Sequence, residues 1–388
     1  MAITLTKQPA EVVPTHDFVD WGMTMDDIGD DVIIKKIGYQ LVYENGDEIT
    51  PLESFRPLVA GDEFITDFQD DIKSLVVTMI PLIDIPAVAN DTMIHRKIKL
   101  KFGEIITDTS TFPCTTTTNI TQESPLITIV NSCIQVYENG FITDGSFAGP
   151  IPLTHQPHNI WQHRESRNWL WLLGSASGVL TTSDGQSASL IPAFFCNYIP
   201  LHPHGLELDN VDTLDWIQYN YSAPGGSGSY RINFRDDCKN GLEFKNIMFL
   251  DPKGGRCCMS FELVQDFTVD TSQQLIQTFV PMYPESSSSN DNVTRQNIGD
   301  VTVTNKQVRD RITLVRDAPN NKEHREWFKA FLASSGYHIQ FKNNNGQLIF
   351  QKFIIESGSI VYNRPDEEVD FVISGFLVPQ YITHRIDR

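Results

Sequence analysis

The chain has 388 residues, of which 40% are apolar and 20% charged, and its formal net charge at pH 7 is −19. This composition is sufficient for packed cores and argues against global disorder. The strong negative charge excludes a free nucleic-acid binder, because such proteins present a positive surface.

The charge is distributed unevenly along the chain. Residues 301–388 contain 12 Lys and Arg against 10 Asp and Glu, whereas residues 1–300 contain 18 against 39. We expect the acidic part to repel nucleic acid and anionic lipid, and the near-neutral part to suit docking on an acidic neighbour such as another copy of the chain. The alternative is that the charge serves solubility alone.

Neither targeting nor membrane insertion is expected. The opening segment MAITLTKQPAEVVP lacks a basic stretch followed by an apolar core, so it does not predict a signal peptide. No stretch of the chain reaches the length of about 18 apolar residues that a membrane-spanning helix needs.

Residues 1–92 are predicted to form an N-terminal β-sandwich domain. The segment 32–44 has period-two or continuous apolar character and leads into Asn45-Gly46, a strong hairpin signal. The pattern continues through 52–68, and the stretch FQDDIKSLVVTMIP that follows is predicted as either one short helix or a strand.

The pentapeptide VYENG occurs twice, at 42–46 and at 136–140. Both copies are predicted as hairpin corners, because Asn-Gly accepts the positive φ angles that tight turns need. The flanking residues do not align beyond the turn, so an internal duplication and two independent hairpins both stay open.

Residues 93–235 are predicted to form a second β-rich domain. Its opening segment, 96–106, alternates cleanly between apolar and lysine side chains, which indicates a half-solvated antiparallel strand. The Thr-rich stretch 109–124 contains Pro113 and indicates an edge strand or an extended arm. A segment rich in Trp, His and Pro follows at 150–205, and 222–229 is predicted as a flexible loop or a bulging corner between strands.

Residues 236–388 are predicted to form a C-terminal α+β unit, one helix on an antiparallel sheet. Two strands flank the turn DPKGG at 251–255, and the polar segment 284–300 is predicted as an exposed arm. An amphipathic helix is expected at about 321–334, followed by alternating strands. The fold class predicted for the whole chain is therefore mainly β, with tandem antiparallel β-sandwich domains and this C-terminal unit.

Histidines and cysteines were considered as metal ligands. Five of the ten histidines lie between 155 and 204, and His202 and His204 are spaced i, i+2, as in some metal sites. No carboxylate or cysteine stands at a recognised ligand spacing from them, so they are weak candidates and no metal or other cofactor is expected. The six cysteines fit neither a zinc ribbon nor a disulfide scaffold, and we expect most of them to be small core residues.

The acidic residues and the tryptophans are the candidates for catalysis and ligand binding. The acidic clusters are adjacent in sequence and flank turns, which is typical of solvated corners, and no nucleophile motif is present, so an enzyme is not expected. Four tryptophans are candidates for an interface or for sugar binding, with core burial as the alternative: Trp161, Trp169, Trp171 and Trp216.

Several segments together resemble β-rich virion proteins of tailed bacteriophages, especially phages of Bacteroidota. They are AITLTKQPAEVVP, KLKFGEII, SPLITIVNSCIQVYENG, FKNIMFLDPKGGRCCMSFELVQDF and HREWFKAFLASSGYHIQ. In the fourth segment Gly254 and Gly255 match the family's hairpin, whereas Arg256-Cys257-Cys258 stand where Asp-Thr is usual.

The resemblance implies a structural virion protein of the tail or baseplate region. It would fold in the host cytoplasm, assemble with itself as a ring or trimer, and dock on other tail or neck proteins. The main alternative is a carbohydrate-binding receptor-recognition module of a tail tip, with a host surface glycan as partner. A glycan-degrading tail enzyme and a double jelly-roll capsid protein are further alternatives.

Overall fold

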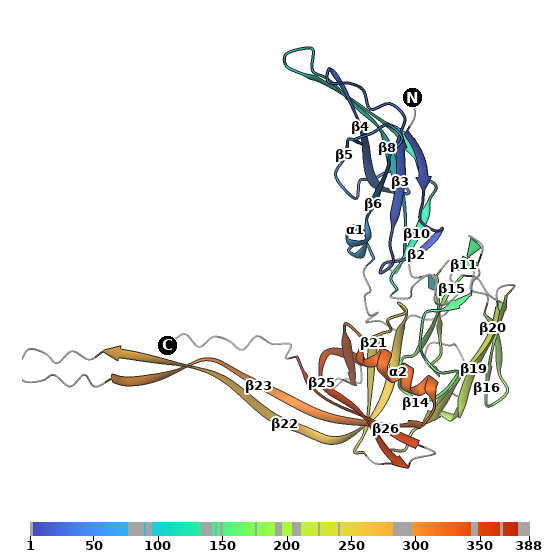
Figure 1. The fold of residues 1–388 in the computed structure, drawn as a ribbon. Helices are drawn as coiled ribbons and strands as arrows, with labels where there is room; N and C mark the ends of the chain where they lie inside the picture. Colours follow the sequence, from blue (N-terminus) through green and yellow to red (C-terminus); the bar gives the residue numbers. More distant parts are fainter. Residues whose placement is uncertain are drawn as a thin grey trace, which may run out of the picture.

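Antiparallel strands dominate the computed structural model of the chain, so the mainly β fold class is confirmed. Figure 1 shows two bodies, an elongated N-terminal one and a larger one that holds the rest of the chain, with a two-stranded ribbon extending from the larger body. The structure describes residues 3–378 except 77–88, 91–94, 133–141, 144–145, 148–149, 175–176, 191–195, 204–210, 224–225, 240, 282–296, 343–347 and 365–367.

The N-terminal body is a sandwich of two sheets. The smaller sheet has the order β1-β3-β6, with β1 (Ile3–Lys7), β3 (Asp20–Met25) and β6 (Glu63–Asp67). The larger sheet has the order β2-β10-β8-β4-β5, with β9 also paired to β8, and consists of β2 (Val12–Pro14), β4 (Ile33–Tyr43), β5 (Glu53–Phe55), β8 (His95–Asp108), β9 (Thr115–Glu123) and β10 (Ile127–Val130).

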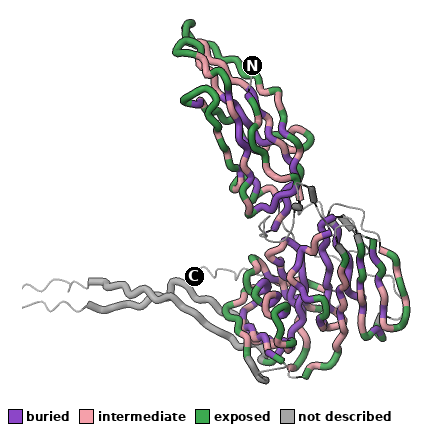
Figure 2. Tube along the Cα trace, turned by 45° about the vertical axis from the view of Figure 1, so that its right-hand side comes forward, coloured by how far each residue is buried: buried purple, intermediate pink, exposed green. Residues whose placement is uncertain are grey.

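Alternating side chains from both sheets fill the core of this body. Trp21, Leu41 and Leu100 are each fully buried there. The short helix α1 (Gln69–Lys73) contributes Ile72, also fully buried, so the stretch that allowed a helix or a strand begins as a helix. Figure 2 shows the buried positions in the interior of both bodies.

The larger body contains two open sheets. One has the order β13-β15-β18-β7, and the other has the order β14-β20-β19-β16-β17. Their strands are β7 (Ala89–Asn90), β13 (Ile151–Pro152), β14 (Asn159–His163), β15 (Trp169–Leu173), β16 (Ser177–Thr182), β17 (Ser187–Leu190), β18 (Cys196–Pro200), β19 (Trp216–Ala223) and β20 (Gly226–Arg235). A separate pair is formed by β11 (Ile142–Thr143) and β12 (Ser146–Phe147), and a 3₁₀ turn, η2, spans Val211–Thr213.

The C-terminal strands close into a six-stranded barrel rather than an open sheet. Its order is β21-β22-β23-β26-β25-β24. The strands are β21 (Phe244–Leu250), β22 (Arg256–Pro281), β23 (Asn297–Pro319), β24 (Tyr337–Lys342), β25 (Leu348–Arg364) and β26 (Glu368–Leu377).

The predicted amphipathic helix is α2 (Lys322–Leu332), which connects β23 to β24. The side chain of Asn321 caps it by accepting from the backbone N–H of His324. Phe328 stacks on Phe371 of β26 at 4.2 Å between ring centroids, and Phe331 lies edge-on to Phe249 of β21 at 5.0 Å. The apolar face of the helix is therefore buried on the barrel.

Three domains were expected, whereas two bodies are observed. The strand β4 pairs with β8 along the whole length of β4, so the break expected at 92/93 falls within one sandwich. One hydrophobic core contains Leu170 and Tyr219 together with Phe261 and Phe371, so the break expected at 235/236 divides a shared core. Sequence periodicity marks single strands but does not show which strands share a core, and this is why both boundaries were misplaced.

The predicted turns are largely confirmed. At the first VYENG, Gly46 has φ of +91° and the Tyr43 N–H donates to Asp47 O at 2.9 Å. At DPKGG, the Asp251 N–H donates to Gly255 O at 2.8 Å, between β21 and β22. The second VYENG, at 136–140, lies outside the described residues.

Of the three segments expected as arms or loops, two are strands where they are described. The Thr-rich segment forms β9, which pairs with β8 alone among the described strands and so is an edge strand. At 222–229, β19 runs to Ala223 and pairs with β20, which begins at Gly226, so the flexible loop is wrong and the alternative of a corner between strands agrees with the pairing. A Cβ on Gly228 would lie 2.5 Å from the Tyr221 hydroxyl oxygen, so this glycine makes room for a tyrosine. Most of the third segment, 284–300, lies outside the residues that the structure describes.

The DPKGG turn also joins the two bodies. Gly254 has φ of +102°, and a Cβ there would lie 1.8 Å from the backbone oxygen of Asn131, at the end of the N-terminal sandwich. Beside this contact, Val12 and Val130 of the first body share a buried cluster with Trp171 of the second.

Neither helix described has the length and apolar run needed to cross a bilayer.

We expect Gly254→Ala to destabilise the protein, because the new methyl group adds a clash to the strain of a positive φ. The expected loss of unfolding free energy is about 2–4 kcal/mol. The control is Gly185→Ala, where φ is +86° but nothing lies within 4 Å of the added Cβ, and where about 1 kcal/mol is expected. Urea unfolding measures both, and equal losses would contradict the close packing at Gly254.

Candidate functional site

Two of the four candidate tryptophans are core residues. Trp169 and Trp171 on β15 are each 1% exposed, so neither is available at the surface for a sugar or a partner. Both lie in the cluster at the junction of the bodies, whereas Leu170 and Leu172 point into the main core on the other side of the strand. The continuous apolar run WLWLL is typical of a strand buried on both faces.

Among the described residues, the structure does not assemble a metal site around His202. His202 is fully buried, with its ring edge-on to Trp169 at 5.4 Å, and His204 lies outside the described residues. In the described part of the chain, no group of three His, Cys, Asp or Glu side chains is placed to hold a metal ion.

The other two tryptophans lie on one face of the five-stranded sheet. Trp161 on β14 and Trp216 on β19 are both register partners of Asn233 on the strand between them, β20. Side chains in register project to the same face of a sheet, so the tertiary structure brings together two residues that are 55 positions apart in sequence. Both are half-buried.

Trp161 marks the place where this sheet meets the base of the ribbon. The fully buried guanidinium of Arg316 on β23 lies 4.1 Å from the centre of the Trp161 ring and 5.0 Å from that of Trp327 on α2. Arg316 also donates to the backbone oxygens of Ser260, at 2.8 Å, and of Trp161, at 2.5 Å. One side chain thus links β14, β22, β23 and α2.

Further charged side chains lie next to Arg316. Asp317, the next residue on β23, accepts from Arg235 at 2.7 Å and from Lys239 at 3.0 Å, and its backbone oxygen accepts from the indole of Trp161. Arg235 in turn lies 4.3 Å from the Trp161 ring centre. We name the set Trp161, Arg235, Ser260, Arg316 and Asp317 the ribbon clamp.

Burial lowers the pKa of two side chains at the ribbon clamp, Arg316 and its neighbour His324. Desolvation lowers the pKa of Arg316 to about 9, against the favourable effect of the nearby Asp317 carboxylate. Desolvation, and then the positive charge of Arg316, lowers the pKa of His324 on α2 to about 4. His324 is therefore neutral at neutral pH.

Sequence reasoning missed Arg316, although a signal was present. In the segment ITLVR the residues Ile312, Leu314 and Arg316 share one face of a strand, and all three are buried. An arginine at an inward position of an alternating strand indicates a buried charge that must find partners.

A buried carboxylate organises the junction of the two bodies. Asp251 is fully buried and lies 2.7 Å from Nδ1 of His155, while the backbone N–H groups of His155 and Lys253 donate to it at 2.8 and 2.9 Å. An Asp–His pair is also found in catalytic triads, but a triad needs a nucleophile within reach. Burial raises the pKa of nearby Cys257 well above its usual value and that of Cys258 to about 12, so both remain thiols. The pair is therefore best explained as an anchor of the DPKGG turn.

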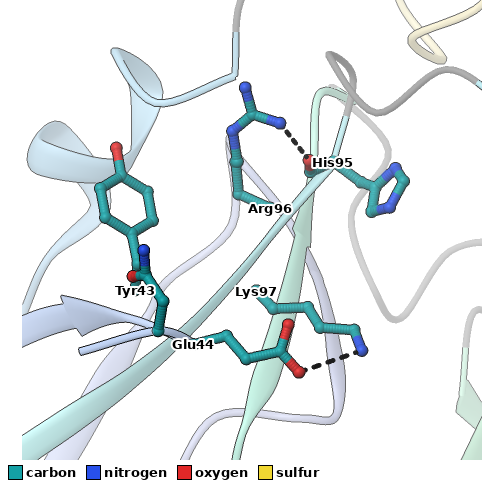
Figure 3. A pocket seen from close by; sticks show the side chains of 6 residues that line it. Tyr43, Glu44, His95, Arg96 and Lys97 are labelled. Atoms are coloured by element: carbon teal, nitrogen blue, oxygen red, sulfur yellow. Dashed lines mark hydrogen bonds and ion pairs between the residues drawn. The ribbon is translucent and has the colours of Figure 1, made fainter. Parts of the chain in front are cut away.

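Two hollows of about 580 Å³ each are present on the described surface. One lies at the junction, between residues such as His16 and Lys73 of the first body and Asp251 and Ser334 of the second. The other is lined by the first VYENG turn and the start of β8: Tyr43, Glu44, Asn45, His95, Arg96 and Lys97. Figure 3 shows the Lys97 ammonium turned toward the Glu44 carboxylate, at 3.5 Å. Among the described residues, the lining of this second hollow contains one carboxylate and no serine or cysteine.

Comparisons with known proteins do not assign a family. No family model and no curated protein matches the chain. Among solved structures, the crystal structure of CBD12 from CALX1.2 matches 58% of this chain and 96% of its own, with 10% identity and a TM-score of 0.17. A similarity this weak supports no conclusion about function.

We expect Arg316→Lys to destabilise the protein by about 2–4 kcal/mol, because lysine cannot stack on both tryptophans or reproduce the two hydrogen bonds. The matched control is Arg311→Lys on the same strand, whose side chain is 40% exposed and pairs with Glu356 at 3.2 Å. An exposed pair contributes at most about 1 kcal/mol. Chemical unfolding measures both variants, and similar losses would contradict the role given to the ribbon clamp.

We expect acid to destabilise the protein through His324. Its pKa is about 4 in the folded state and 6.5 ordinarily, so the unfolded state binds more protons between these values and stability falls as the pH drops through this window. The full effect is about 3 kcal/mol. Urea unfolding at pH 4, 5.5 and 7 should show a weaker pH dependence in His324→Asn than in the control, His158→Asn, an exposed position. An unchanged pH dependence in His324→Asn would contradict the assignment.

Proposed function

We propose that the protein is a structural component of a tailed-phage virion, in the tail or baseplate region, and that it acts by assembling with copies of itself. The observation that carries this proposal is the ribbon formed by β22 and β23. The phage setting rests on the sequence motifs, and the self-assembly rests on the ribbon.

The ribbon extends well beyond the barrel. β22 pairs with β21 only from Arg256 to Glu262, and β23 pairs with β26 only from Arg311 to Pro319. Beyond those residues the two strands pair with each other, out to Pro281 and Asn297. At about 3.3 Å per residue, the stretch 297–310 spans about 45 Å. Figure 1 shows this length projecting away from both bodies.

A projecting two-stranded ribbon is suited to joining another subunit. Two strands alone are marginally stable in water, and each outer edge presents a row of backbone N–H and C=O groups. These groups have no strand partner among the described residues over most of the ribbon. A strand from a second copy would satisfy them by β-augmentation.

The base of the ribbon is fixed, which favours a mechanical role. The ribbon clamp ties β23 to β14, β22 and α2 through a fully buried arginine. The adjacent Arg311 pairs with Glu356 of β25 at 3.2 Å. Force on the ribbon would therefore reach the body through packed and hydrogen-bonded groups.

A variant with a shortened ribbon tests this proposal. In the variant, residues 270–307 are replaced by an Asn-Gly turn that connects β22 and β23 near the barrel, and light scattering after size-exclusion chromatography measures the mass. We expect the full chain to form a closed oligomer and the shortened chain to be a monomer with an unchanged melting temperature. Electron microscopy of the full chain would distinguish a ring from a fibre.

The matched control removes the exposed tip of the β8–β9 hairpin, residues 110–114, at the far end of the other body. This control should keep the mass of the full chain. A monomeric full chain, or an oligomer that the shortened ribbon leaves intact, would contradict the proposal.

A further inference from the structure

The outer face of the five-stranded sheet carries a polar surface beside Trp161 of the ribbon clamp. We name it the amide face and define it by residues of three neighbouring strands: Asn159, Trp216, Gln218, Asn220, Arg231 and Asn233. Their strand neighbours Ile217, Tyr219 and Ile232 are fully or almost fully buried on the opposite side. The alternation therefore leaves one face in the core and the other in contact with solvent.

The register places these side chains in rows across the strands. Arg231 on β20 is partnered by Asn159 on β14 and by Gln218 on β19. In the adjacent row, Asn233 is partnered by Trp216. The face is thus a flat array of planar hydrogen-bonding groups with an indole at one side.

Hydrogen bonds within the array hold the amides in place. Gln218 donates to the side-chain oxygen of Asn220 at 2.9 Å, and Asn233 donates to that of Asn159 at 2.6 Å. Groups that are already oriented lose little entropy when a ligand binds.

Arg231 gives the amide face a positive charge. Its guanidinium lies 4.3 Å from the centre of the Trp216 ring, and its Nε donates to Asn233 at 3.0 Å. Among the described residues no carboxylate pairs with it, and its two terminal nitrogens have no acceptor. A guanidinium stacked on an indole keeps its in-plane donors available for two parallel hydrogen bonds to a carboxylate.

We propose that the amide face binds an acidic saccharide. The carboxylate of the sugar binds Arg231, its hydroxyl groups bind the amides, and Trp216 provides an apolar surface beside them. One unneutralised arginine complements one carboxylate, whereas a long polyanion would be repelled by a chain with a net charge of −19. This inference goes beyond the assembly role and does not depend on it.

The experiment is isothermal titration of the full chain with two acidic sugars and their neutral counterparts. The probes are 3′-sialyllactose against lactose, and galacturonate against its methyl ester. We expect at least one acidic probe to bind and its neutral counterpart to bind about tenfold more weakly or not at all, as loss of a charge-assisted hydrogen bond predicts. Arg231→Gln should weaken acidic binding by a similar factor.

The matched control is Arg56→Gln, which removes the same charge from the N-terminal body and should leave binding unchanged. Asn159→Ala, an exposed change that spares the core, should weaken binding without altering the melting temperature. Failure of both acidic probes to bind, or equal effects of Arg231→Gln and Arg56→Gln, would overturn the proposal. Light scattering on the same samples reports assembly separately, so the two proposals fail independently.

Discussion

The buried guanidinium of Arg316 is the interaction on which the larger body depends. A charge removed from water is costly unless it is paired and hydrogen-bonded, and here two backbone oxygens, two indole rings and the neighbouring Asp317 compensate. These partners come from separate strands and from α2. The protonated side chain therefore gains these partners only when the five-stranded sheet, the barrel and the helix have come together.

The same logic applies at the junction with the N-terminal body. Asp251 is buried because His155 and two backbone N–H groups surround it, and the turn that it organises presents Gly254 to the backbone of Asn131. Close backbone approach and a satisfied carboxylate together fix the turn. A body anchored in this way gives the ribbon a firm base.

Most of the secondary structure could be predicted from the sequence, because period-two alternation and turn residues act locally. The strand β8, the DPKGG turn and helix α2 are examples. Closure of the C-terminal sheet into a barrel could not be predicted, since closure depends on which edges meet. The loop expected at 222–229 was wrong because glycine there accommodates a tyrosine ring, a contact between strands that composition does not show.

The sequence by itself determined the β-rich class, the acidic charge and the position of the helix, because each follows from local patterns or from simple sums. Only the tertiary structure decided which candidate residues are buried and which lie together on one face. It buried Trp169 and Trp171 between two cores, placed Trp161 and Trp216 on one face, and left Arg231 without a carboxylate among the described residues. The physical reason is that burial and pairing are properties of strands brought side by side, and strand order and register are set by the packing of the whole chain.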